Sequence, residues 1–171
     1  MLFEPHIDKG TQAEADFIGV QSESNLEYFH DWAKQPKRHL EVLHNWLTQR
    51  LDVKSKFSIA DSSLAGKKVM VYAGNMGLMQ GIDIVLDLAA RLLVHDDVGI
   101  LLLGRGSEVP RLKREAATRG LNNILFHDEI PPSEVPAVLS QCHIGLLLLD
   151  PRLKTHNIPG KLISYMHAGL P

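Results

Sequence analysis

Cysteine, aromatic residues and long apolar runs are all scarce in this chain of 171 residues. The single cysteine, Cys142, cannot form an internal disulfide, which fits a reducing cytoplasmic setting. Its apolar neighbours predict a buried thiol rather than a nucleophile. No run of about 18 apolar residues exists, so the sequence predicts no membrane-spanning helix. The first residues also lack the basic start and apolar core of a secretion signal.

An excess of charge of either sign is missing too. The chain carries 18 basic and 20 acidic residues, a net charge of −2, which gives no reason to expect nucleic acid or an anionic membrane as a partner. A basic cluster at 34–39 leaves two interpretations open, a membrane-facing patch or, more simply, a solvated linker. The nine histidines form no H-E-x-x-H motif and no pairs with cysteine, so no metal site is expected.

What the chain does contain is a regular alternation of apolar strands and amphipathic helices from residue 67 onward. The expected strands are 68–73, 98–103, 123–127 and 143–148, and the expected helices are 80–94, 107–119, 133–140 and 160–168. Ser133 is expected to cap the third helix and Gly120 to end the second. This pattern predicts an α/β fold, a Rossmann-like parallel sheet with helices on both faces.

The first third of the chain is less regular. It predicts a strand at 15–21, a helix at 23–32 and a strand at 39–44. The polar, turn-rich stretch 48–66 is typical of a linker between two units. The chain stops where a helix has closed and a strand would begin, so we expect it to be a piece of a longer protein.

Two glycine loops follow the first two strands of the regular region, at 74–77 and 104–106. Glycine lets backbone N–H groups approach a ligand, and a helix N-terminus adds about half a positive charge there. Neither loop is a P-loop or a complete G-x-G-x-x-G motif. Tight turns need glycine in any case, so each loop alone leaves ligand contact and a simple turn equally open.

Two cations lie where an anion would be held. Arg105 follows a strand and suits bidentate phosphate binding, although a solvated surface arginine is as good an explanation. Lys161 begins a predicted helix, where an ammonium opposes the helix dipole unless an anion is near, and this favours function. His156 lies in a loop at the same sheet edge. No residue presents itself as a nucleophile or general base, so the catalytic residues stay unassigned.

Several strings together resemble the nucleotide-binding half of retaining glycosyltransferases of the two-domain GT-B fold, family 4. They include VYAGNMGLMQGIDIVLDLAARL (71–92), LLLGRGSEVPRLK (101–113), ILFHDEIPPSEVPAVLSQCHIGLLLL (124–149) and IPGKLISYMHAGLP (158–171). The likeness is to bacterial enzymes that build surface polysaccharides and O-antigens, including the fucosamine- and fucose-transferring branch. It implies that 1–38 is the tail of an acceptor domain, 39–66 an interdomain strand and linker, and 67–171 a donor domain truncated at its C-terminus.

The resemblance implies that the intact enzyme transfers a sugar from a UDP- or GDP-sugar to a lipid-linked or glycan acceptor with retention, in polysaccharide or lipopolysaccharide biosynthesis. It implies no cofactor and no metal. It also implies a cytoplasmic enzyme at the inner face of the membrane, with peripheral membrane contact through the acceptor domain. The piece by itself is expected to bind donor at best, without turnover.

The resemblance also implies the donor-binding residues. They are Gly74, Asn75, Met76, Gly77, Gln80, Gly104, Arg105, Gly106, Phe126, His127, Ile130, His156, Asn157, Gly160, Lys161 and Ser164. Family members often have arginine and lysine at the positions of Asn75 and Gln80, and glutamates at those of His156 and Ser164. The Ser164 side chain has one oxygen, whereas a carboxylate has two that can accept hydrogen bonds from a ribose, so we expect weaker ribose binding. Two alternatives stay open, a non-catalytic donor-binding or scaffolding relative and a sugar-nucleotide epimerase of the same fold.

Overall fold

The computed structural model describes residues 14–46, 53–150 and 159–171. The chain divides into two compact units, a smaller one that contains 14–46 and a larger one that contains 53–150 and 161–171. Within the described residues, no helix combines the length and the apolar character needed to cross a bilayer.

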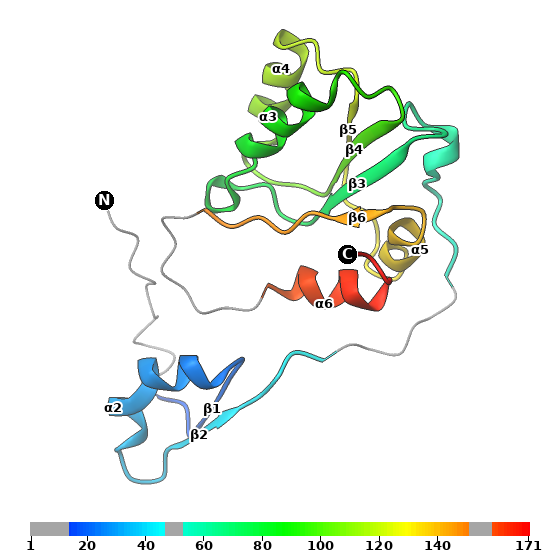
Figure 1. The fold of residues 1–171 in the computed structure, drawn as a ribbon. Coiled ribbons are helices and arrows are strands. Elements are labelled where there is room, and N and C mark those ends of the chain that lie inside the picture. The colour runs from blue at the N-terminus through cyan, green and yellow to red at the C-terminus, as the bar shows by residue number, and fades with distance from the viewer. Residues whose placement is uncertain (1–13, 47–52, 151–158) are drawn as a thin grey trace. The chain divides into compact units, whose positions relative to one another are not determined.

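The smaller unit is a pair of parallel strands joined by helical turns (Figure 1). Its elements are β1 (Phe17–Val20), η1 (Glu23–Phe29), α2 (His30–Ala33) and β2 (His39–Val42). The sequence predicts one α-helix over 23–32, but most of that stretch is a 3₁₀ helix. The Asn25 N–H bonds the Ser22 carbonyl three residues back at 3.0 Å, which sets the tighter winding from the start. In the basic cluster, Lys34 pairs with Asp31 at 3.0 Å.

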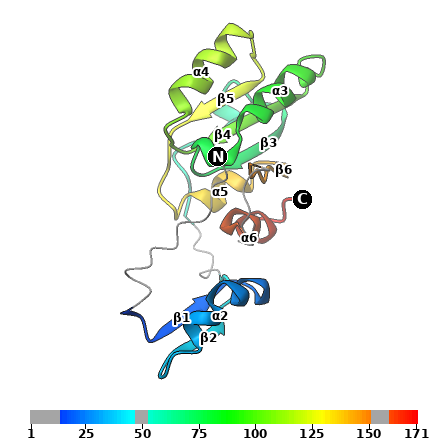
Figure 2. The same ribbon diagram turned by 90° about the vertical axis from the view of Figure 1, so that its left-hand side faces the viewer.

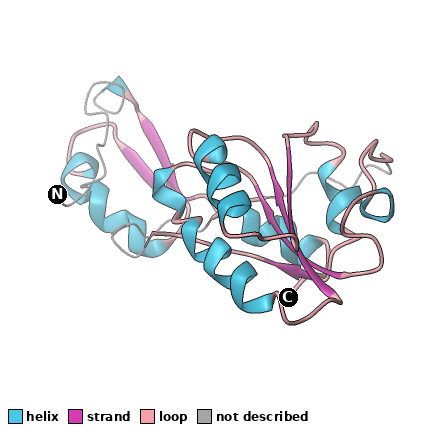
Figure 3. Ribbon diagram, turned by 90° about the horizontal axis from the view of Figure 1, so that it is seen from above, coloured by secondary structure: helices cyan, strands magenta, loops and turns pink. Residues whose placement is uncertain are grey.

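The larger unit is built on a four-stranded parallel sheet in the order β5-β4-β3-β6 (Figures 1 and 3). Its strands are β3 (Lys68–Ala73), β4 (Val98–Leu103), β5 (Ile124–His127) and β6 (Ile144–Gly145). In chain order this is 3-2-1-4, so the strand order reverses between β3 and β6. The helices that follow these two strands, 83–92 and 160–167, pack on opposite faces of the sheet, and in such folds ligands bind in the crevice that opens there.

Helices cover both faces of this sheet, α3 and α4 on one and α5 and α6 on the other (Figure 2). They are α3 (Asp83–Leu92), α4 (Val109–Thr118), α5 (Val135–Leu139) and α6 (Gly160–His167). Successive side chains of β4 point to opposite faces of the sheet. Leu102 packs toward α3 and α4, whereas Leu101 packs toward α5 and α6. The predicted α/β class is confirmed.

Burial also agrees with the expectation for the cysteine. Cys142 is buried in the α5/α6 layer, and burial raises the pKa of its thiol to about 12. A thiol with so high a pKa is uncharged at neutral pH and inert as a nucleophile.

The predicted elements differ from the observed ones most clearly in three places. Helix α3 begins at Asp83, not at 80, because a short turn η3 (Leu78–Gln80) and a left-handed Gly81, φ 59°, precede it. Helix α5 is preceded by Glu134 in the N-cap position rather than by the predicted Ser133. Only two residues of β6 form ladder pairs, where the sequence predicts six.

Part of the expected linker belongs to the core of the larger unit. Ile59, in the short turn η2 (Ile59–Asp61), and Leu64 are 6% and 0% exposed, and both lie in the cluster formed with α5 and α6. Two apolar side chains in a polar stretch leave no periodic signal, so only the structure reveals their burial. The assignment of acceptor-domain and donor-domain segments stays a prediction.

Candidate functional site

The loops that follow β3, β4 and β5 form one continuous surface at the carboxyl edge of the sheet. Main-chain hydrogen bonds continue the ladder beyond the strands. The Gly74 N–H donates to the Leu103 carbonyl at 2.8 Å, and the Gly104 N–H donates to the His127 carbonyl at 3.0 Å. The Met76 N–H then donates to the Arg105 carbonyl at 2.7 Å. The two predicted glycine loops are therefore paired with each other.

Loop pairing explains the glycines of the second loop. Gly104 has φ 142°, and a Cβ there would lie 2.1 Å from the Gly74 carbonyl oxygen. Gly106 has φ 157°, and a Cβ there would lie 2.2 Å from the Met76 carbonyl oxygen. The Met76 side chain itself is fully buried under α3 and α4. Gly104, Gly106 and Met76 thus shape the surface by packing. Their contact with a ligand stays a prediction.

An uncharged pair fixes the turn after β3. The Gln80 Oε1 accepts hydrogen bonds from the Gly77 N–H at 3.0 Å and from the Asn75 side-chain amide at 3.3 Å. The Tyr72 hydroxyl donates to the Asn75 carbonyl at 2.7 Å. The side chains of Asn75 and Gln80, both predicted donor-binding residues, thus hold each other and the turn in place.

Lys161 lies across the start of this turn. A Cβ on Gly74, whose φ is 140°, would come within 2.6 Å of the Lys161 Cε, so the absent side chain of Gly74 makes room for the lysine. The ammonium nitrogen is 5.0 Å from the centre of the Tyr72 ring. Helix α6 is fixed in this position because the Ala73 N–H donates to the Tyr165 hydroxyl at 2.9 Å.

The Lys161 ammonium lies in a partly desolvated setting. Its side chain is half-buried, and burial lowers the pKa of the ammonium below its ordinary value of 10.5. Within the ranges that the structure describes, no carboxylate forms an ion pair with it. A desolvated cation at the start of a helix is held at some cost, which an anionic ligand would offset.

Arg105 has a carboxylate partner that the sequence gives no reason to single out. Its Nη1 donates to the Glu129 Oε1 at 3.2 Å, and its Nε lies 3.1 Å from the Oε2. The two residues stand 24 positions apart and meet only because the ends of β4 and β5 are adjacent. They line a hollow of about 350 Å³, together with Ala73, Gly74, Asn75, Leu103, Gly104, Ile130 and Val135.

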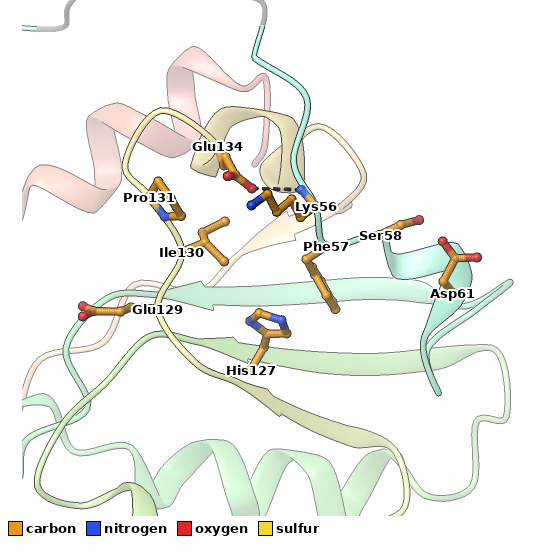
Figure 4. Close-up of a pocket in the computed structure, with 9 residues that line it drawn as sticks. All are labelled: Lys56, Phe57, Ser58, Asp61, His127, Glu129, Ile130, Pro131 and Glu134. Atoms are coloured by element: carbon orange, nitrogen blue, oxygen red, sulfur yellow. Dashed lines mark hydrogen bonds between the residues drawn. The ribbon is translucent and has the colours of Figure 1, made fainter.

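A second hollow, of about 410 Å³, lies between the segments 56–61 and 127–134 (Figure 4). Phe57 packs on the His127 ring there, with ring centres 4.2 Å apart. The Glu134 carboxylate accepts the Lys56 N–H at 2.9 Å and so ties the segment before η2 to α5. Glu129 and Ile130 line both hollows, and Figure 4 shows Glu129 extending away from Phe57 and His127.

The remaining predicted residues have varied positions. Phe126 is partly buried against the α3/α4 layer. Gly160 and Ser164 belong to α6. His156 and Asn157 lie outside the described residues. In the described part of the chain no three His, Cys, Asp or Glu side chains gather as metal ligands would.

Comparison with known proteins identifies the family of this arrangement. The family described as "Glycosyl transferases group 1" matches residues 54–171. The glycosyl transferase WcaI of Escherichia coli (strain K12), whose name assigns it to colanic acid biosynthesis, is 29% identical over 103 residues, covering 60% of this chain and 25% of WcaI. The glycosyltransferase WbjE of Pseudomonas aeruginosa is 26% identical over 106 residues, covering 62% of this chain and 26% of WbjE. The chain thus spans about a quarter of these curated relatives.

Solved structures share the fold. The HepE protein of Anabaena, in a complex with UDP, superimposes with a TM-score of 0.73 at 16% identity, over 99% of this chain and 50% of HepE. A TarM mutant of S. aureus, in a complex with fondaparinux, alpha-GlcNAc-glycerol and UDP, gives a TM-score of 0.68 at 12% identity, over 99% of this chain and 34% of TarM. At these identities the likeness is one of architecture.

Proposed function

Because this chain belongs to the glycosyl transferases group 1 family, we propose that its larger unit holds the nucleotide-sugar donor of a glycosyl transfer. The observation that carries the proposal is Lys161, a half-desolvated ammonium placed across Gly74 at the point where the strand order reverses. That is where sheets of this kind bind nucleotides. The UDP present in the HepE and TarM complexes supports a nucleoside diphosphate as the ligand class.

In the proposed reaction, the residues of this chain bind and stabilise rather than attack. Lys161 and Arg105 lie at the edge where a leaving diphosphate would develop charge, and cations fixed there before the reaction lower its barrier. The 350 Å³ hollow beside Arg105 and Ile130 is of a size that small-molecule sites have, and we assign the base to it.

The finer parts of the proposal rest on the resemblance to family 4. We propose a retaining transfer of a sugar from a UDP- or GDP-sugar to a lipid-linked or glycan acceptor in surface-polysaccharide synthesis, without cofactor or metal. The intact enzyme would work in the cytoplasm at the membrane face, with its acceptor held by a further domain. The relatives WcaI and WbjE, both named glycosyltransferases, support the transfer class.

Calorimetric titration of the chain with UDP, GDP and ADP, and then with their sugar conjugates, tests the donor proposal directly. Saturable binding that is selective for one nucleotide supports it and identifies the base. Absence of binding for every nucleotide at millimolar concentration contradicts it for this chain.

The substitution Lys161→Met tests the residue that carries the proposal. It removes the charge but keeps much of the side chain's length, so we expect UDP affinity to fall about tenfold or more while the fold is kept. Because burying the ammonium is unfavourable, the free energy of unfolding should stay equal or rise. The matched control is Lys113→Met on the exposed surface of α4, which should change neither quantity. Unchanged UDP affinity in the Lys161 variant would argue against a diphosphate site at Gly74.

A second candidate function is a donor-binding relative without catalytic activity. The observation that favours it is the absence of a carboxylate at positions 156 and 164. The variants Ser164→Glu and His156→Glu separate the two candidates. A rise in donor affinity would show that positions 156 and 164 face the donor and that carboxylates there strengthen its binding. No change in either variant would mean that these two positions have another role in this chain.

A further inference from the structure

We propose that Glu129 is an internal counter-ion of Arg105, which competes with an anionic ligand for the guanidinium and so limits the affinity of the hollow for a diphosphate. The inference rests on the proposed donor function and adds to it a residue that sets the affinity for the donor's diphosphate. It starts from the Arg105–Glu129 pair at the mouth of the 350 Å³ hollow.

The geometry of the pair places the carboxylate where it competes with an anion. The Glu129 Oε1 accepts a hydrogen bond from the Arg105 Nη1 at 3.2 Å, and the Oε2 lies 3.1 Å from the Nε. A phosphate would use the same kind of N–H donors, since a guanidinium binds carboxylate and phosphate alike. A phosphate at Arg105 would therefore meet the negative charge of the Glu129 carboxylate and compete with it for the guanidinium.

The strength of the pair suits an exchange. The side chains of Arg105 and Glu129 are 78% and 57% exposed, and ion pairs between exposed side chains are weak. The carboxylate lowers the affinity for an anion without blocking it. Glu129 also extends away from Phe57 and His127, so its release leaves the contact between these two rings in place (Figure 4).

Lys161 and Arg105 thus play different parts toward one ligand. Within the described ranges Lys161 has no carboxylate partner, whereas Arg105 has one, Glu129. An anion that reaches only Lys161 gains one cation, while a diphosphate that spans both gains a second by replacing Glu129. A neutral nucleoside gains neither cation, so its affinity should not depend on Glu129.

The test is calorimetric titration of the full chain with inorganic pyrophosphate, UDP and uridine at one fixed ionic strength. The proteins are the wild type, Glu129→Gln, Arg105→Gln and the double variant. We expect Glu129→Gln to bind pyrophosphate and UDP about two- to fivefold more tightly, the size of effect that exposed ion pairs give, and to leave uridine unchanged. In the Arg105→Gln background, the gain from Glu129→Gln should disappear.

The matched control is Asp128→Asn, which removes the same charge one residue away. Asp128 is 89% exposed and pairs with Lys113 at 4.0 Å rather than with Arg105, so its loss should tighten pyrophosphate binding less than the loss of Glu129. Circular dichroism and urea unfolding of each variant confirm that the fold is kept. Because Glu129 is exposed, the substitution is not expected to unfold the chain.

The outcomes separate the inference from the function on which it rests. If the wild type binds UDP and Glu129→Gln binds it equally or more weakly, the counter-ion role is overturned and the donor site stands. Weaker binding by Glu129→Gln would instead indicate that the Glu129 carboxylate accepts hydrogen bonds from hydroxyl groups of the ligand. If neither the wild type nor any variant binds UDP or pyrophosphate, the donor proposal fails and the inference fails with it.

Discussion

At the scale of single residues, the glycines at the carboxyl edge are required by contact with neighbouring backbone. Gly104 has a positive φ, and any side chain there would overlap the Gly74 carbonyl. That carbonyl belongs to the loop on which Lys161 lies. A substitution at Gly104 must therefore push apart the two loops whose pairing builds the candidate site.

The substitution Gly104→Ala tests this requirement, with Gly120→Ala as its control. Both glycines have positive φ, but a Cβ on Gly120 would meet no atom within 4 Å. We expect the control to cost about 1 kcal/mol, from backbone conformation alone, and Gly104→Ala to cost about 3 kcal/mol or more. Urea unfolding measures both, and equal costs would mean that the loops adjust without strain.

At the scale of elements, the segment before η2 is held to the sheet through Glu134 at the start of α5. The Lys56 N–H, helped by the Ser55 hydroxyl, holds the pKa of Glu134 below its ordinary value of 4.5. A carboxyl whose pKa is lowered on folding stabilises the folded state above its unfolded-state pKa. That contribution is lost as the pH falls through the lowered value.

This linkage predicts the pH dependence of a Glu134→Ala variant. At pH 7 its urea midpoint should lie below that of the wild type, and the gap should narrow as the pH falls below 4.5. Glu134→Gln keeps an acceptor oxygen for both bonds, so its midpoint should lie between the two. A gap that stays constant down to pH 2 would show that the carboxylate's charge contributes nothing.

At the scale of the whole molecule, the larger unit contains both core layers and every described residue of the candidate site except Gly160. The family match begins at residue 54. A chain shortened to 53–171 should therefore fold cooperatively and bind UDP with the affinity of the full chain. Circular dichroism with thermal unfolding and calorimetry measure this, and a large loss of affinity would mean that the first 52 residues contribute to the donor site.

The sequence predicts the architecture of the larger unit well because its signals are local. Apolar runs and helical periodicity locate β3, β4 and β5 and the helices α3 and α4 to within a few residues. Boundaries shift where side chains act on nearby backbone, as Gln80 does when it bonds the Gly77 N–H and delays the start of α3. The glycine loops and their place at the carboxyl edge also follow from the sequence.

By itself, then, the sequence determined the fold class, the edge where a ligand would bind and the family resemblance, since each depends on patterns that span a few neighbouring residues. Tertiary structure alone decided which groups meet at that edge. The Ala73–Tyr165 bond joins residues 92 positions apart, and the Arg105–Glu129 pair joins residues 24 apart. Such contacts depend on the order and twist of the strands, and no local pattern encodes which distant side chain a given strand end will face.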